Sequence, residues 1–176
     1  MPEDGDLRAE RLWERERADA IRAKCEHGLG TVEEESKAST QLSPLLYDLT
    51  SLQREANGRF GFSAKTTLSI AQALYEKHKV LTYPRTDSRA LPEDYLPTVT
   101  AAMEALAAPY RPYVKKILGG KWVRPNKRIF NNAKISDHFA IIPTSLAPKH
   151  LSETEAKIYD LVTKRFLAVF FPAAEF

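Results

Sequence analysis

Helical spacing of apolar positions is clearest in two segments of the first half of the chain. Residues 7–26 lack proline and glycine and are rich in helix-forming side chains, which predicts a helix. Residues 64–78 show an amphipathic pattern, and Ser63 is well placed to cap a helix there. The apolar face of that second segment consists of Leu68, Ala71 and Tyr75.

Capping signals mark two further helices. Ser152 and Glu155 fit a capping box, and the segment after them repeats apolar residues with helical spacing, which predicts a helix. That repeat consists of Ile158, Tyr159, Val162, Phe166 and Val169. Thr50 and Gln53 fit another capping box, so we expect a short helix over residues 51–57 that the following glycine ends.

The remaining pattern is shorter and less regular. We expect a helix that begins near residue 92 or 98 and runs to about 107, and another over residues 110–118. "KVLTY" (79–83) predicts a short strand, whereas "FAIIPT" (139–144) is typical of either a buried strand or a turn. The fold class is therefore mainly α with a few short strands, and this order of elements fits a winged-helix type of DNA-binding unit.

Composition places the chain among ordinary globular proteins. It has 176 residues, of which 43% are apolar and 28% are charged, and this suits one domain, or one domain with an appendage. The sequence contains no apolar run long enough to span a membrane, and its N-terminus shows no signal region. The single cysteine, Cys25, excludes a disulfide framework and a cysteine-based zinc site, and it fits a reducing compartment.

Charge is distributed unevenly along the chain. Residues 1–37 hold 11 acidic and 7 basic residues, a net charge of −4, and residues 38–176 hold 12 acidic and 19 basic residues, a net charge of +7. Eight bases and no acid lie between Glu104 and Asp137. This basic stretch fits a surface that faces a polyanion, although a solvated surface explains it as well. The aromatic residues within it could stack on unpaired bases or belong to the core: Tyr110, Tyr113, Trp122 and Phe130.

Tyr83 is either a packing residue or a nucleophile. It stands in "KVLTYPRTDSRALPEDY" (79–95), where an apolar run leads into a tyrosine, a proline and an arginine. Pro84 favours an extended conformation at Tyr83, and residues two apart on an extended segment project to the same side. Tyr83 and Arg85 can therefore present a phenol and a guanidinium together. Arginine offers paired N–H donors to phosphate, so the pair suits attack on a phosphodiester.

Four blocks of the sequence resemble one known family. "LTYPRTDSRALPEDY" resembles the active-site tyrosine segment of type IA DNA topoisomerases, most closely in the bacterial topoisomerase III branch. "LLYDLTSLQREANGRFGFSAKTTLSIAQALYEKHKV" resembles the segment before that tyrosine, and "DHFAIIPT" resembles the later histidine block. "LSETEAKIYDLVTKRFLAVFFPAAEF" resembles the helix that returns the chain to the arch. The resemblance covers residues 7–176 and implies a winged-helix-like, tyrosine-bearing domain.

The resemblance implies roles for individual residues. Tyr83 matches the nucleophile, which keeps the 5′-phosphate of the cut strand as a phosphotyrosine ester, and Arg85 matches the arginine on the scissile phosphate. His138 matches a histidine that helps to hold that phosphate, although a core histidine is the ordinary reading. The candidate DNA-binding residues are Arg59, Ser63, Lys65, Thr86, Asp87, Ser88, Lys121, Arg124, Lys127 and Arg128.

The resemblance also implies a domain organisation and a cofactor. Residues 1–45 correspond to flanking arch sequence, and residues 46–176 to the tyrosine-bearing catalytic domain. The family requires Mg²⁺, held in a metal-binding domain that nothing in this sequence matches. Asp4 and Asp6 are interpreted as part of an exposed N-terminal stretch. The apolar ending "FFPAAEF" is interpreted as a point inside a longer protein.

These expectations define a function and leave two alternatives open. The chain is expected to belong to an ATP-independent enzyme that cuts one DNA strand, passes a strand and reseals the cut. The isolated chain is expected to bind single-stranded DNA without relaxing DNA. The expected location is the bacterial cytoplasm near the nucleoid, with a helicase as a possible partner and no membrane. The alternatives are a non-catalytic winged-helix DNA-binding module and a basic protein-interaction domain.

Overall fold

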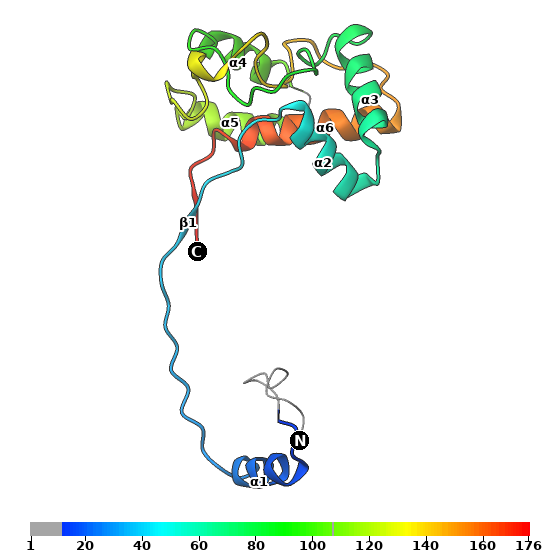
Figure 1. Ribbon diagram of the computed structural model, residues 1–176. Coiled ribbons are helices and arrows are strands. Elements are labelled where there is room, and N and C mark those ends of the chain that lie inside the picture. Colours follow the sequence, from blue (N-terminus) through cyan, green and yellow to red (C-terminus); the bar gives the residue numbers. More distant parts are fainter. Residues whose placement is uncertain (1–11, 107) are drawn as a thin grey trace. The chain divides into compact units, whose positions relative to one another are not determined.

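The computed structural model describes residues 12–106 and 108–176. The chain divides into two units, Met1–Ala38 and Ser39–Phe176, and each is described by itself (Figure 1). The resemblance implies a boundary between residues 45 and 46, and the observed division falls a few residues before it. The assignment of the two regions to an arch and a catalytic domain stays a prediction.

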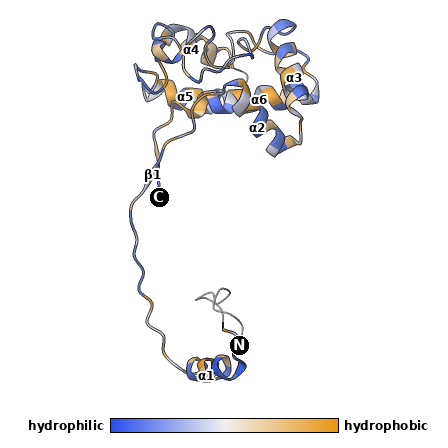
Figure 2. Cartoon of the chain, in the orientation of Figure 1, coloured by the Kyte–Doolittle hydropathy of each residue, from blue (hydrophilic) through white to orange (hydrophobic). Residues whose placement is uncertain are grey.

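The first unit contains the helix α1, Arg15–Cys25. None of the residues of α1 is buried, and most of them are hydrophilic (Figure 2). The apolar residues Leu12 and Ile21 are exposed. The predicted helix over residues 7–26 is confirmed from Arg15 onward. Residues 7–11, and the acidic pair Asp4 and Asp6, lie outside the described residues.

The second unit is a helical cluster built around one central helix. α6 packs against α2, α3 and α5, α3 also packs against α2, and α5 also packs against α4 (Figure 1). The mainly α class with a few short strands is therefore confirmed. The helices are α2 Leu49–Phe60, α3 Ala64–Glu76, α4 Leu96–Glu104, α5 Arg111–Gly119 and α6 Glu153–Ala168, with 3₁₀ turns at Ala108–Tyr110 (η1) and Asn132–Lys134 (η2).

α6 supplies the middle of the hydrophobic core. Ser152 caps it as predicted: its hydroxyl accepts from the amide of Glu155, whose carboxylate accepts from the amide of Ser152. Ile158 and Phe166, from the predicted apolar repeat, are completely buried. Figure 2 shows hydrophobic residues concentrated along α5 and α6, where these helices face the cluster. Truncating a fully buried phenylalanine such as Phe166 costs about 3–5 kcal/mol of stability in general.

The start and end of α2 differ from the sequence prediction. Asp48, and not Thr50, is the N-cap: its carboxylate accepts from the amide of Ser51 at 2.7 Å, and Ser51 Oγ accepts from the amide of Asp48. A carboxylate is a good cap because its charge also favours the positive end of the helix. Gly58 lies inside the helix. The helix ends before Gly61, whose φ of 69° suits a residue without a β-carbon.

The other helices lie close to their predicted positions. Ser63 caps α3 as predicted, because its hydroxyl accepts from the amide of Thr66 at 3.0 Å. α4 begins at Leu96, between the two starts that the sequence allowed, with a proline in its first turn. α5 confirms the helix expected over residues 110–118, and it also has a proline in its first turn.

The strand predicted over residues 79–83 is wrong: only Leu81 pairs, in a single antiparallel bridge to Pro143. Two features stop the ladder from extending. The N–H of Val80 donates to the carbonyl of Leu74 at 2.9 Å, and not across the bridge. The N–H of Ile142 donates to the side-chain hydroxyl of Thr82, at 2.9 Å, instead of to a backbone carbonyl. The two strands are β1 Thr40–Gln41 and β2 Ala174–Glu175, which pair antiparallel.

A polar network joins α2 to α6. Tyr47 Oη donates to Glu55 Oε2 at 2.5 Å, and Arg165 also bonds this carboxylate while it lies 4.2 Å from the centre of the Tyr47 ring. Burial raises the pKa of Tyr47 well above its ordinary value, and the hydrogen bond to Glu55 raises it further. Burial alone raises the pKa of Glu55, but the Tyr47 hydrogen bond and the charge of Arg165 outweigh it and lower that pKa. The network therefore keeps a neutral phenol, a carboxylate and a guanidinium together.

Among the described residues, no helix is both long and apolar enough to cross a membrane.

Candidate active site

The segment that carries Tyr83 is held in place by hydrogen bonds on both sides. Thr82 Oγ1 donates to the carbonyl of Ala140 at 3.0 Å, and the amide of Thr82 donates to the carbonyl of Ile142 at 3.0 Å. Beyond Arg85, Thr86 and Ser88 are tied by hydrogen bonds to the chain just before that segment, at His138 and Lys134. The predicted block "FAIIPT" is therefore the partner that fixes the path of the tyrosine segment.

Tyr83 lies between two aromatic rings. The centre of its ring is 4.3 Å from that of His138, at an interplanar angle of 47°, and 5.4 Å from that of Tyr75, in an edge-to-face arrangement. Tyr75 comes from α3 and His138 comes from the segment before "FAIIPT". Tyr83 itself is half-buried, so its ring is packed while part of the side chain remains accessible. The structure thus brings Tyr83 and His138 together, as the resemblance of their two sequence blocks to one family implied.

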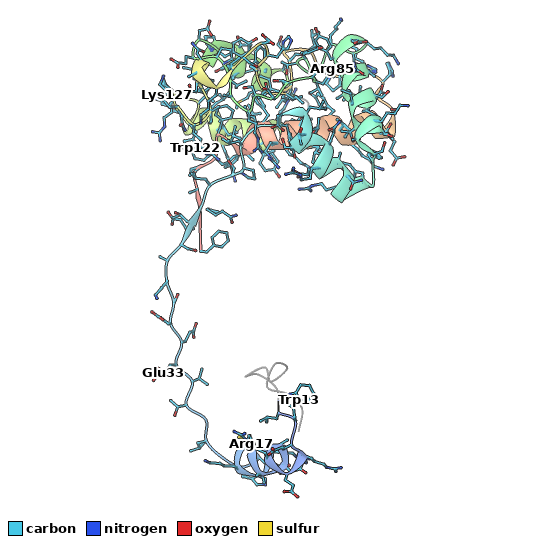
Figure 3. All side chains as sticks on the ribbon, in the orientation of Figure 1. Trp13, Arg17, Glu33, Arg85, Trp122 and Lys127 are labelled. Carbon is cyan, nitrogen blue, oxygen red and sulfur yellow. The ribbon has the colours of Figure 1, made fainter. Side chains whose placement is uncertain are left out.

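Arg85 is exposed and lies beside α3 (Figure 3). With the side-chain amide of Gln72 oriented so that its oxygen faces Arg85, Gln72 Oε1 accepts from Nε and from Nη2 of Arg85, at 3.1 Å each. Arginine carries five N–H donors in a rigid plane, so this contact leaves three of them unused by Gln72. Arg85 can therefore be held by the protein and still bind an anion.

The three residues after Arg85 have different surroundings. Thr86 and Ser88 are buried: Thr86 Oγ1 donates to the carbonyl of His138 at 2.9 Å, and Ser88 Oγ donates to the carbonyl of Lys134 at 2.8 Å. Both hydroxyls thus tie the tyrosine segment to the chain around His138. Asp87 is exposed and accepts from Ser136 Oγ at 3.2 Å.

Three predicted DNA-binding residues lie around the turn between α2 and α3. Arg59, in the last turn of α2, is exposed and pairs with Glu55 at 2.8 Å. Ser63 and Lys65 are exposed at the start of α3, the helix that also carries Gln72 and contacts Arg85. Ser63 and Lys65 are therefore connected to the candidate site through α3, and Arg59 lies at the end of the preceding helix.

The predicted DNA-binding residues of the basic stretch lie elsewhere on the unit. Figure 3 shows Lys127 and Trp122 near α5 and far from Arg85 beside α3. Lys127 pairs with Glu93 at 2.7 Å, and Arg128 donates to the backbone carbonyl of Ser43. The remaining two, Lys121 and Arg124, are exposed. The structure does not bring this group together with Tyr83.

Most aromatic residues of the basic stretch belong to the core. Phe130 is buried, and Trp122 packs on Phe171 with ring centres 5.3 Å apart. Tyr110 donates to Asp160 at 2.9 Å. Burial raises the pKa of Tyr110 well above its ordinary value, and this hydrogen bond raises it further. Tyr113 is the exposed member, with 53% of its surface accessible. Of these four aromatic rings, that of Tyr113 is therefore the one most open to solvent.

A magnesium ion in a protein usually keeps several waters and is bound by one or two carboxylates together with substrate phosphates. No group of three or more His, Cys, Asp or Glu side chains that could hold a metal ion occurs in the described part of the chain. The chemistry considered below is therefore derived from the side chains that are present.

Two neighbours of the candidate nucleophile were not singled out from the sequence as site residues. Gln72 and Tyr75 lie one turn apart on α3. Gln72 contacts Arg85, and Tyr75 contacts Tyr83. Tyr75 was assigned to the apolar face of its helix. A polar side chain at position 72, flanked by apolar residues on the same helix face, is the signal that could have identified Gln72.

Comparison with known proteins identifies the family. A family described as DNA topoisomerase matches residues 3–176, which is nearly the whole chain. The chain therefore belongs to the DNA topoisomerase family. Among curated relatives, it is 48% identical over 170 residues to DNA topoisomerase 3 of Bacillus cereus and 54% identical over 142 residues to DNA topoisomerase 3 of Bacillus licheniformis. The resemblance to type IA topoisomerases, in the topoisomerase III branch, is thereby confirmed.

The matched region is a small part of each relative. The alignments cover 94% and 79% of this chain, but only 23% and 19% of the two relatives. In three dimensions the chain is similar to a full-length topoisomerase I from Thermotoga maritima, with a TM-score of 0.65 and 23% sequence identity. That comparison covers 97% of this chain and 27% of the other, and it supports the fold.

Proposed function

We propose that this chain is the nucleophile-bearing part of a type IA DNA topoisomerase and that Tyr83 attacks a phosphodiester of single-stranded DNA. The phenolic oxygen forms a bond to phosphorus, the bond from phosphorus to the 3′-oxygen breaks, and that oxygen leaves as a hydroxyl. The 5′-phosphate stays on Tyr83 as a phosphotyrosine ester. The energy of the broken bond is kept in this ester, so the 3′-hydroxyl can reverse the reaction without ATP.

Arg85 and His138 are the groups proposed to stabilise the reacting phosphate. A guanidinium is always charged and can offer two parallel N–H donors to phosphate oxygens, where negative charge increases during attack. Arg85 has N–H groups that Gln72 does not use. His138 packs against the Tyr83 ring, so its exposed imidazole is close to the bond that forms.

The observations that carry this proposal are that His138 packs on the Tyr83 ring and that α3 contacts both Tyr83, through Tyr75, and Arg85, through Gln72. A tyrosine that served only for packing would not need an exposed arginine two residues away that is held by two hydrogen bonds to the same helix. A non-catalytic DNA-binding module would account for the basic surface but not for this arrangement. Formation of a covalent adduct between the full-length gene product and an oligonucleotide is the test that separates the two.

The requirements of the whole enzyme are further proposals. We infer that Mg²⁺ acts from a region outside the described residues, because these offer no suitable cluster of ligands. Strand passage, a helicase partner and a location in the bacterial cytoplasm near the nucleoid are proposed from the same family membership. This chain spans about a quarter of the length of its curated relatives, so these properties belong to a longer polypeptide.

The isolated chain should bind single-stranded DNA weakly and in preference to duplex DNA. Contacts between phosphates and basic residues release counterions, so raising salt from about 50 to about 200 mM should lower the affinity roughly twentyfold if about three phosphates are contacted. Fluorescence anisotropy with a labelled oligonucleotide at both salt concentrations measures this. Equal or tighter binding to the matching duplex would count against the preference, and binding that ignores salt would remove the electrostatic explanation.

The isolated chain should not relax supercoiled DNA, with or without added magnesium. Relaxation requires the cut ends to be held apart while a strand passes, and this chain corresponds to 23% of the curated relative from Bacillus cereus. Gel electrophoresis of a supercoiled plasmid after incubation with the purified chain measures this. Relaxation that depends on Tyr83 in this chain would show that no further region is needed.

A further inference from the structure

Gln72 is placed to control the orientation of Arg85. Its neighbours Ala71 and Leu74 are both completely buried, so the backbone of α3 at this point is fixed by the core. One turn further along the same helix, the ring of Tyr75 meets the ring of Tyr83 edge to face. The same rigid helix therefore contacts both proposed reactive side chains.

We propose that Gln72 is a positioning residue for Arg85, which it holds so that the unused N–H groups face the phosphate that Tyr83 attacks. This inference rests on the proposed function. An exposed arginine on its own samples many rotamers, and ordering it when DNA binds costs entropy. Because Gln72 Oε1 accepts from both Nε and Nη2, it fixes the plane of the guanidinium before DNA arrives.

The chemistry of the amide explains why glutamine suits this position. Its oxygen can accept two hydrogen bonds, yet it carries no charge. A carboxylate at the same place would hold Arg85 as firmly, but its negative charge would compete with phosphate for the guanidinium. An apolar side chain would leave the guanidinium free to move. The three cases give different expected results, which makes the role testable.

The hydrogen bond can be tested in the isolated chain without any catalysis. In a ¹⁵N–¹H spectrum, the Nε–H of Arg85 should exchange with water more slowly than that of the exposed Arg124. This protection should be lost in Gln72→Leu and kept in Gln72→Glu. Gln53→Leu is the matched control, because Gln53 lies on α2 and donates to the carbonyl of Ala64 at the start of α3, which is eight positions before Gln72. If Gln72→Leu leaves the Arg85 signal unchanged, Gln72 does not hold Arg85 and the proposal is overturned.

Cleavage by the full-length gene product tests the consequence of that bond. Misplacing a catalytic group costs roughly ten- to a hundredfold in rate, so Gln72→Leu should slow single-turnover cleavage at least about tenfold. In an Arg85→Ala background the same substitution should have almost no effect, because the group that it positions is gone. Gln72→Glu should also slow cleavage although Arg85 stays ordered. Equal effects of Gln72→Leu in both backgrounds would contradict the proposal.

The two tests separate failure of this inference from failure of the proposed function. If the unsubstituted enzyme forms no adduct through Tyr83, the proposed function is wrong, and the exchange measurement still decides whether Gln72 holds Arg85. If adduct forms but cleavage does not respond to Gln72→Leu, the function stands and the positioning role is wrong. Backbone amide spectra of each variant show whether the fold is intact.

Discussion

Replacing Tyr83 with phenylalanine is expected to reduce strand cleavage by the full-length gene product to background, a loss of at least about 10⁴-fold. The substitution removes the oxygen that attacks phosphorus and keeps the ring that packs between Tyr75 and His138. Affinity for single-stranded DNA should therefore change by less than about twofold, since the oxygen is not a charged phosphate ligand. Cleavage of a labelled oligonucleotide and anisotropy on the same protein measure the two quantities.

Tyr75→Phe is the matched control for this substitution. Tyr75 belongs to the same aromatic cluster, and the change is again the loss of one hydroxyl. Cleavage should persist in Tyr75→Phe at a rate close to that of the unsubstituted enzyme. If instead Tyr83→Phe still cleaves, another group is the nucleophile. If both variants fail equally, the cluster matters only as a packed unit.

Arg85→Ala is expected to slow cleavage about a hundredfold without removing it. The substitution deletes a fixed donor to a phosphate whose charge grows in the transition state, and one such contact is worth about 3 kcal/mol. Arg85→Lys should recover only part of the loss, because an ammonium acts as a point charge and cannot make two parallel bonds. Single-turnover rates at saturating DNA measure the effect on the chemical step.

Arg124→Ala is the control for charge alone. Arg124 is exposed and lies in the sequence between Trp122 and Lys127, both of which Figure 3 shows near α5 and away from Arg85. Its removal should weaken binding in a salt-dependent way and leave the rate at saturating DNA nearly unchanged. A loss of rate as large as that of Arg85→Ala would mean that total positive charge, and not the placement of Arg85, determines cleavage.

Helices with strong local signals were predictable from the sequence. Ser63 and Ser152 cap α3 and α6 as expected, because a capping hydroxyl needs only residues three positions away. α2 was placed less accurately, since Asp48 follows an extended segment whose pairing with Ile141 depends on the fold. The strand expected at Leu81 was lost because the two N–H groups that would extend the ladder, those of Val80 and Ile142, bond to the carbonyl of Leu74 and to the hydroxyl of Thr82.

The candidate site was predictable only in its local part. Pro84 and the spacing of two residues predict that Tyr83 and Arg85 project to the same side, and the structure has both side chains in contact with α3, through Tyr75 and Gln72. The contact with His138 joins residues far apart in the chain, and it was expected only through the resemblance to a family. The bond from Arg85 to Gln72 depends on how α3 packs, which no local pattern reports. Thr86 is buried and donates to the carbonyl of His138, whereas its neighbour Asp87 is exposed. This difference also depends on tertiary contacts.

The most direct test of the central claim is to map the covalent adduct between the full-length gene product and single-stranded DNA. Oligonucleotides labelled at either end are incubated with the enzyme, trapped with denaturant, and the attached peptide is identified by mass spectrometry. The account predicts that the 3′-labelled fragment stays on the protein and that the attached peptide carries the DNA phosphate on Tyr83. DNA attached to another residue, or a protein that retains the 5′-labelled fragment, would contradict it.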